Sequence, residues 1–161
     1  MSAHFIIPAD ICKQLDAEHL QLVNAVIAAH QRAARENENA STFAMRNAHF
    51  GSWSIENGIV SAILSLGATH GPLRAAREVY SWATQASIRS TIERGMKVPG
   101  FGNSFYKDQI DPAWQHVGSI IYELFPKIHK RIDDLTRWVN TPIRGSLYPN
   151  AALYTAATCE E

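Results

Sequence analysis

Residues Lys97 to Pro112 read KVPGFGNSFYKDQIDP and form the most informative stretch of the chain. The first part is an expected loop, because glycine and proline between Gly95 and Gly102 interrupt any regular pattern. The end is an expected helix start, because Asp111 is a good N-cap and Pro112 suits the first helical position, where its missing N–H does no harm. We therefore predict an ordered loop, rather than a flexible linker, that leads into a helix.

Apolar residues elsewhere recur every three to four positions, and sustained alternation with period two is hard to find. This periodicity predicts an all-α protein. The helix that begins at Asp111 is expected to present one continuous apolar face, formed by Trp114, Val117, Ile121, Leu124 and Ile128 and widened by Ile120 and Phe125.

Helices are also expected before the loop. One pattern runs from Ile11 to Arg35, with a break near Asp16 as an alternative, since that residue can cap a second helix. A short helix is expected after Ser41, a strongly apolar one from Ser54 to Gly67, and one from Pro72 to Arg94 that ends at Gly95.

Composition favours one cytoplasmic domain. The chain has 161 residues, 46% of them apolar, so a packed core is expected. Lys+Arg and Asp+Glu number 15 each, so no basic field is available for nucleic acid or an anionic membrane. Cys12 and Cys159 lie near opposite ends and indicate neither a disulfide framework nor a metal site. No signal-peptide pattern is found, and the apolar segment near Ile59 to Ala68 is too short to span a bilayer.

The Lys97 to Pro112 stretch resembles a signature of the citrate synthase family, which reads PGFGH, then YK after a few residues, then DPR. Asn103 stands where the family has a catalytic histidine, and Ala113 where it has a carboxylate-binding arginine. A glycine motif alone is weak evidence, so the order of further motifs matters. The matching residues are Pro99, Gly100, Phe101, Gly102, Tyr106, Lys107, Asp111 and Pro112.

Two upstream segments are similar to other motifs of that family. ARENENASTFAMR, from Ala34 to Arg46, resembles ADHxxNASTFAAR, whose histidine contacts the carbonyl of the keto acid; Glu36 replaces that histidine. GATHGPLRAAREVY, from Gly67 to Tyr80, resembles GxxxGPLHGGANE, whose histidine helps turn the thioester methyl into an enol; Arg74 replaces it.

A downstream segment, LYPNAALY from Leu147 to Tyr154, is similar to LYPNVDFY, and Ala152 replaces the aspartate that is the family's general base. Four motifs in one order imply a citrate-synthase-like helical fold, mainly the small domain with the adjoining dimerisation helices. The expected layout is a single domain, 1–161, with N-terminal and dimer-forming helices in 1–70 and small-domain-like helices in 71–161.

The substitutions exclude citrate synthesis by the family mechanism. Enolisation needs a base, and Ala152 cannot be one, while the Arg74 guanidinium stays charged and cannot shuttle a proton. The resemblance implies that Glu36, Arg74 and Asn103 face one cavity, as acid or base, anion clamp and carbonyl polariser respectively. The alternative is that Glu36 and Arg74 form solvated pairs with each other or with Arg35 and Glu78.

The family also implies binding residues. The backbone of Val98, Pro99, Gly100, Phe101 and Gly102 corresponds to the recess for the adenine of coenzyme A, although such glycines equally serve a tight turn. Substrate contacts are expected from Asn39, Arg46, His70, Tyr106 and Lys107; a lone histidine such as His70 is more often structural.

Two functions are open from the sequence. The first is a repurposed enzyme of altered carbon–carbon bond chemistry, a lyase, condensation or decarboxylation, on a small anionic carboxylate or acyl-CoA with no cofactor required. The second is a catalytically silent protein that binds a metabolite or a partner protein, which Ala113 and Ala152 favour. A homodimer through the Ser54 to Gly67 helix is expected in either case, and a companion large-domain subunit is an alternative that would complete the site.

Overall fold

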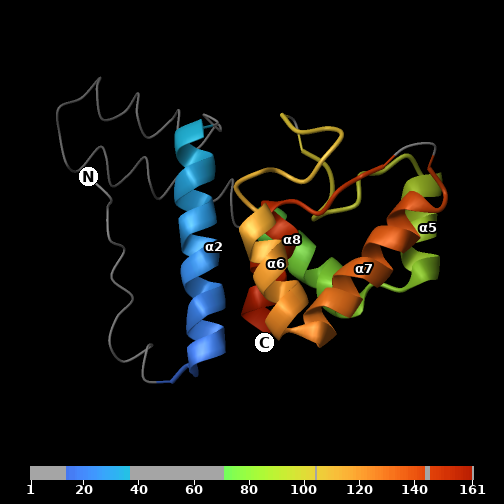
Figure 1. Ribbon diagram of the computed structural model, residues 1–161. Helices are drawn as coiled ribbons and strands as arrows, with labels where there is room; N and C mark the ends of the chain where they lie inside the picture. The colour runs from blue at the N-terminus through green and yellow to red at the C-terminus, as the bar shows by residue number, and fades with distance from the viewer. Residues whose placement is uncertain (1–13, 37–70, 104, 144–145, 161) are drawn as a thin grey trace, which may run out of the picture.

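The computed structural model describes residues 14–36, 71–103, 105–143 and 146–160 (Figure 1). In these ranges every regular element is a helix, which confirms the all-α prediction. The elements are α2 (Ala17–Glu36), a helix over residues 71–82, α5 (Gln85–Glu93), α6 (Gln115–Leu124), α7 (Pro126–Asn140) and α8 (Ala151–Glu160). The helices expected after Ser41 and from Ser54 to Gly67 lie outside the described residues.

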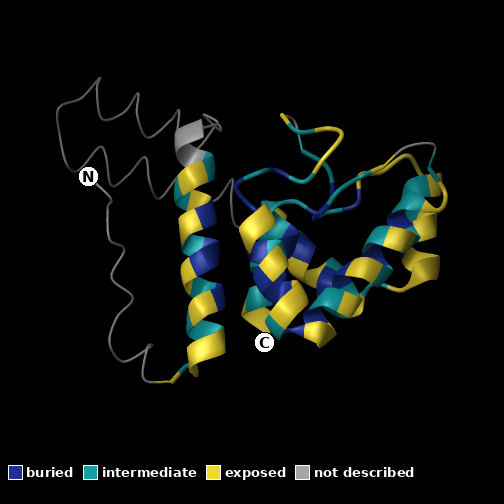
Figure 2. Ribbon diagram, in the orientation of Figure 1, coloured by how far each residue is buried: buried dark blue, intermediate teal, exposed yellow. Residues whose placement is uncertain are grey.

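The core lies where these helices meet. Helix α6 packs against both α2 and α7, α2 also contacts α8, and α5 packs against α7. Figure 2 shows the buried residues of α2 on the side that faces α6 and the exposed ones on the opposite side. The largest fully buried side chains are Trp114, Leu22, Ile88, Ile121, Ile128, Leu135, Leu153, Val117 and Val139. Burial of this apolar surface provides the main driving force for the fold.

The observed helix starts match the predicted ones only in part. The Asp16 carboxylate accepts a hydrogen bond from the His19 backbone N–H at 2.9 Å, so α2 begins where the alternative with a break at Asp16 expected. The predicted start at Asp111 is wrong by a few residues, because residues 112–114 form a turn and α6 begins at Gln115. The Asp111 carboxylate instead accepts from the Ala113 N–H at 2.9 Å within that turn.

Two predicted continuous helices are each interrupted. The Pro72 to Arg94 helix is wrong, because residues 83 and 84 leave the helical conformation and α5 starts afresh. Thr84 and Ser87 form a capping box there, each side chain bonding the other's backbone N–H. The apolar face from Trp114 to Ile128 is divided between α6 and α7, because Phe125 is non-helical and Pro126 begins α7.

Side chains from α7 and α8 hold the 71–82 helix in place. The Arg131 guanidinium of α7 donates to the backbone carbonyls of Tyr80 at 2.7 Å and Ala83 at 2.9 Å. Arg77 forms an ion pair with Glu160 of α8, and the hydrogen bond from Arg77 lowers the pKa of the Glu160 carboxyl below its ordinary value. None of the described helices combines the length and the hydropathy that a membrane span requires.

Candidate functional site

The loop that contains Gly100 and Gly102 is tied to the segment before α8. Phe101 and Pro149 form an isolated antiparallel bridge. The Gly102 N–H donates to the Tyr148 carbonyl at 2.9 Å, and the Asn150 N–H donates to the Gly100 carbonyl at 2.9 Å. The loop of the Lys97 to Pro112 motif and the start of the Leu147 to Tyr154 motif therefore form one unit. Figure 1 shows the two segments beside each other.

Asn150 joins this unit to α8. Its amide Nδ2 donates to the Gly102 carbonyl at 2.9 Å, while its Oδ1 accepts from the Ala152 N–H at 3.0 Å. Its backbone carbonyl accepts from Leu153 at 3.1 Å and from Tyr154 at 3.2 Å. One side chain thus caps a helix and fixes a loop that is 48 residues away in the sequence. Asn150 belongs to the LYPNAALY motif, but the sequence alone does not indicate this role.

Asn140, at the end of α7, secures the other side of the unit. Its Oδ1 accepts from the Leu147 N–H at 2.7 Å, and its Nδ2 donates to the Leu147 carbonyl at 3.0 Å. The amide therefore pairs with both backbone groups of one residue, as a neighbouring strand would. The contact exists only in the folded chain, so the sequence carries no local signal for the role of Asn140.

Gly100 and Gly102 both adopt positive φ, at 88° and 80°. L-residues with a side chain rarely adopt such values. A Cβ atom at Gly100 would also lie 3.1 Å from the Leu153 Cβ, so the loop and α8 approach closely there. Both the backbone conformation and the close contact with Leu153 therefore favour glycine at Gly100, whether or not a ligand binds.

A hollow of about 480 Å³ lies along this loop. Four of the residues that the sequence assigned to ligand binding or catalysis line it together, namely Val98, Phe101, Gly102 and Asn103. Ile92, Ile143 and Leu147 supply apolar walls, and Lys97 is the one charged residue among the described residues that line the hollow. The arrangement suits a mainly apolar group next to an anionic one.

Asn103 is held by its neighbours within the loop. Its Oδ1 accepts from the backbone N–H of Phe105 at 2.8 Å and of Tyr106 at 3.4 Å, as in an Asx turn. Its Nδ2 donates to the buried Asp111 carboxylate at 3.4 Å. The amide has two N–H groups on Nδ2, so one remains for another acceptor.

The other residues with a predicted role do not line the hollow or are not described by the structure. The Arg74 side chain is 84% exposed, and its Nε lies 3.4 Å from the Glu78 carboxylate, as in the solvated-pair alternative. Glu36 is the last residue of α2, and its side chain is not described. Asn39, Arg46 and His70 lie outside the described residues. Pro99, Gly100, Tyr106 and Lys107 are not among the lining residues.

The helical architecture and the interlocked loop define a citrate-synthase-like fold. The solved structure of citryl-CoA lyase from Hydrogenobacter thermophilus superposes with a TM-score of 0.72 at 18% sequence identity. The match covers 91% of this chain and 59% of the lyase chain, so this chain spans less than two thirds of that structure. No protein-family model and no curated protein sequence matches the chain. The superposition confirms the predicted fold.

Proposed function

We propose that the chain binds a CoA thioester in the loop hollow and is a repurposed citrate-synthase-like enzyme that makes or breaks a carbon–carbon bond of its substrate, but does not make citrate. One observation carries the proposal. One hollow is lined by Val98, Phe101, Gly102 and Asn103, and hydrogen bonds from Asn150 and Asn140 hold the backbone around it. The family resemblance places these four residues around the adenine and the reacting carbonyl. A lyase named for a CoA thioester has the same fold, which supports this class of substrate.

The binding part of the proposal assigns roles to the described lining residues. The apolar walls accept the adenine ring, and Lys97 attracts the CoA phosphates as a mobile point charge. The hydrogen bonds of Asn150 and Asn140 keep the loop in its binding conformation before the ligand arrives, which lowers the ordering cost of binding.

In the chemical step, the remaining N–H of the Asn103 amide donates a hydrogen bond to the carbonyl oxygen of the substrate. A fixed donor at that oxygen stabilises negative charge as it develops, but an amide cannot transfer a proton. Glu36 remains the proposed acid or base, and Arg74 the proposed clamp for a substrate carboxylate. Arg74 would have to exchange its exposed contact with Glu78 for the substrate.

A thermal-shift series with CoA, acetyl-CoA, citrate and oxaloacetate tests the binding. A ligand present at about a hundred times its dissociation constant stabilises the native state by about 2.7 kcal/mol. Lys97→Ala should weaken the CoA shift, whereas Lys127→Ala, which removes an exposed lysine of α7, should leave it unchanged. A folded protein that no CoA compound stabilises would contradict the proposal.

A silent binding protein is the second candidate. The exposed Arg74 and Glu78 pair and the internal hydrogen bonds of Asn103 favour it, because both side chains have partners without a substrate. Turnover of each ligand that binds separates the two candidates. Products that disappear in Glu36→Ala and Asn103→Ala would support the enzyme, whereas binding without turnover would support the silent protein.

Two partners are proposed on the sequence alone. The first is a second copy of this chain, through the apolar segment from Ser54 to Gly67. The second is a separate large-domain polypeptide that completes the cleft. Co-purification with a large-domain polypeptide that restores turnover would support the latter, and full turnover by the chain alone would exclude the need for it.

A further inference from the structure

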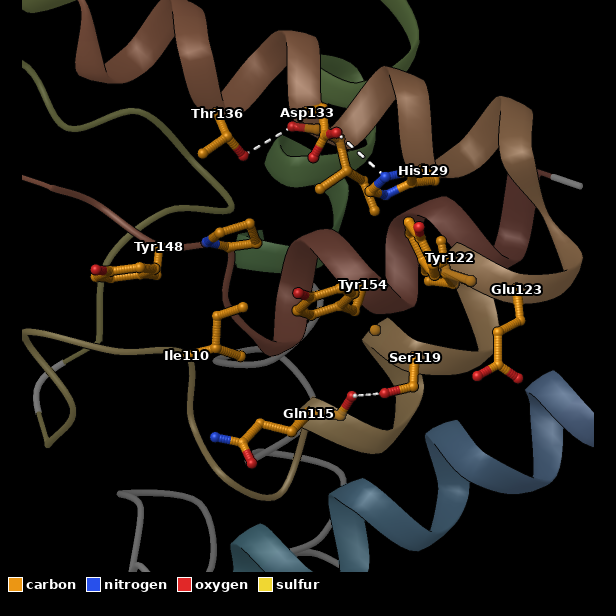
Figure 3. A pocket seen from close by; sticks show the side chains of 14 residues that line it. Ile110, Gln115, Ser119, Tyr122, Glu123, His129, Asp133, Thr136, Tyr148 and Tyr154 are labelled. Atoms are coloured by element: carbon orange, nitrogen blue, oxygen red, sulfur yellow. Dashed lines mark hydrogen bonds and ion pairs between the residues drawn. The ribbon is translucent and has the colours of Figure 1, made fainter.

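A second pocket, of about 510 Å³, lies between α6, α7 and α8 and shares no residue with the loop hollow. Its volume is in the range of small-molecule sites in proteins. Figure 3 shows Tyr154 rising from α8 into the pocket, with His129 and Asp133 on α7 to one side and Ser119 on α6 to the other. Ile110, Ile121 and Ile132 provide apolar walls. The pocket is therefore a candidate site independent of the proposed function.

Tyr154 places a polar group on the wall of this pocket. The residue is only 4% exposed, and its ring stacks on Trp114 with 5.9 Å between ring centroids. Phenylalanine would serve that stacking equally well. The hydroxyl lines the pocket and has no hydrogen-bond partner among the described residues. The oxygen is not enclosed, so its O–H can donate to water or to an acceptor on a ligand in the pocket.

Gly118 of α6 leaves the space next to this hydroxyl open. A Cβ atom at Gly118 would lie 3.5 Å from the Tyr154 Oη, at ordinary contact distance. Alanine would therefore fit at this position and is the better helix former. Glycine here weakens the helix and leaves space beside the hydroxyl of Tyr154, which is the one buried hydroxyl-bearing residue among the described lining residues.

Charges around the pocket decide which ligands suit it. Asp133 and Glu123 line it, and the His129 Nε2 lies 3.2 Å from the Asp133 carboxylate. Burial first, and then the charge of Asp133, raises the pKa of Tyr154 to about 12, so its hydroxyl stays protonated and can donate. An anion would meet two carboxylates and one paired histidine, which is unfavourable.

We propose that this pocket binds an uncharged aromatic molecule whose single acceptor oxygen takes the hydrogen bond of the Tyr154 hydroxyl. The rings of Tyr122, Tyr148 and His129 line the same pocket and provide faces and edges for an aromatic ligand. Tyr122 and His129 already contact each other edge to face, with 4.9 Å between centroids.

The test uses benzamide and benzoate, which match in size and shape and differ in charge. In an NMR titration of the ¹⁵N-labelled full chain, benzamide should shift the backbone amide signals of Gly118 and Tyr154 saturably. Benzoate should bind at least about tenfold more weakly, because of the two carboxylates. Absence of benzamide binding at these signals, or equal binding of benzoate, would overturn the proposal.

Two variants test the geometry. Tyr154→Phe keeps the ring and should weaken benzamide about tenfold, while toluene, which has no acceptor, should bind as before. Gly118→Ala should raise the melting temperature and weaken both ligands, so lost binding cannot be attributed to unfolding. Gly71→Ala is the control, because no atom lies within 4 Å of a Cβ placed there. Unchanged benzamide affinity in Gly118→Ala would overturn the proposal.

Discussion

Gly100 shows how one residue joins two motifs of the chain. A Cβ atom there would lie only 3.1 Å from Leu153 of α8, and the Gly100 carbonyl accepts the hydrogen bond from the Asn150 N–H. The glycine motif looked like a ligand loop in the sequence. In the folded chain Gly100 packs against α8, whereas Val98, Phe101, Gly102 and Asn103 line the hollow.

Gly100→Ala should destabilise the protein more than Gly95→Ala. Both glycines have positive φ, 88° and 70°, so both substitutions cost about 1–2 kcal/mol of backbone strain. Only the Gly100 Cβ would meet neighbours, the nearest at 3.1 Å, whereas the Gly95 Cβ would meet none within 4 Å. Urea unfolding of the two variants isolates the packing contribution as their difference. Equal losses would mean that α8 does not approach the loop so closely.

His30 should make the protein less stable in mild acid. His30 is an exposed residue of α2, but its ring packs edge to face with the Trp114 ring, with 4.8 Å between centroids. Burial of part of the ring by this packing lowers the pKa of His30 below its ordinary value of 6.5. The unfolded chain therefore binds the proton more readily than the native state. The free energy of unfolding should fall as the pH drops below about 6.5 toward the native pKa, and be unaffected above it.

The measurement is the melting temperature at pH 7.5 and pH 5.5. His30→Gln keeps a donor for Thr155, whose Oγ1 lies 3.0 Å from the His30 Nε2, but cannot be protonated in this range. The variant should lose less stability on acidification than the natural chain. The same loss in both proteins would show that other groups cause the pH dependence.

Arg131 of α7 caps the C-terminal end of the helix over residues 71–82. Its Nε and one terminal nitrogen donate to carbonyls at residues 80 and 83, and its Cζ lies 5.5 Å from the centroid of the Trp138 ring. A planar guanidinium can serve several carbonyls at once, and lysine cannot reproduce this fork. The last turn of the 71–82 helix therefore depends on α7.

Arg131→Lys should destabilise the protein by about 1–3 kcal/mol, the cost of leaving partly buried carbonyls with fewer partners. Hydrogen exchange should become faster in residues 79–84 before it changes in α6. Arg137→Lys is the control, because Arg137 lies on the same helix and pairs with Asp134 with a side chain that is 70% exposed. Equal effects of the two substitutions would contradict a capping role for Arg131.

The presence of helices could be predicted from the sequence, but several of the residues at which they begin or end could not. Apolar spacing is a local signal, and it identified α2, the 71–94 region and the α6 region. The break at residues 83 and 84 also has a local signal, the capping box of Thr84 and Ser87. Serine stands there in place of the usual Glu or Gln, so the sequence pattern does not indicate a helix start. The contacts of Arg131 and Asn140 carry no local signal, because the partner carbonyls exist only in the folded chain.

The candidate site could be predicted only where it follows the backbone of a motif. Val98, Phe101, Gly102 and Asn103 meet because they are consecutive or nearly so, and the loop that holds them is fixed by Asn150. Arg74 belongs to another helix, where its carboxylate partner at Glu78 is four residues away. Which residue of a motif faces the site therefore depends on packing between elements, and a single sequence does not contain that information directly.

We expect the protein to form a homodimer, with a mass twice the 17.9 kDa of one chain. The segment from Ser54 to Gly67 has Ile55, Ile59, Ile63 and Leu66 at helical spacing, more apolar surface than one small core needs. Ile63→Asp should give a monomer in light scattering, because a buried unpaired carboxylate is costly in an interface. The control is Trp82→Asp, which alters an 81% exposed aromatic residue and should leave the dimer intact. A monomeric natural chain, or a dimer lost only in Trp82→Asp, would contradict an interface at Ser54 to Gly67.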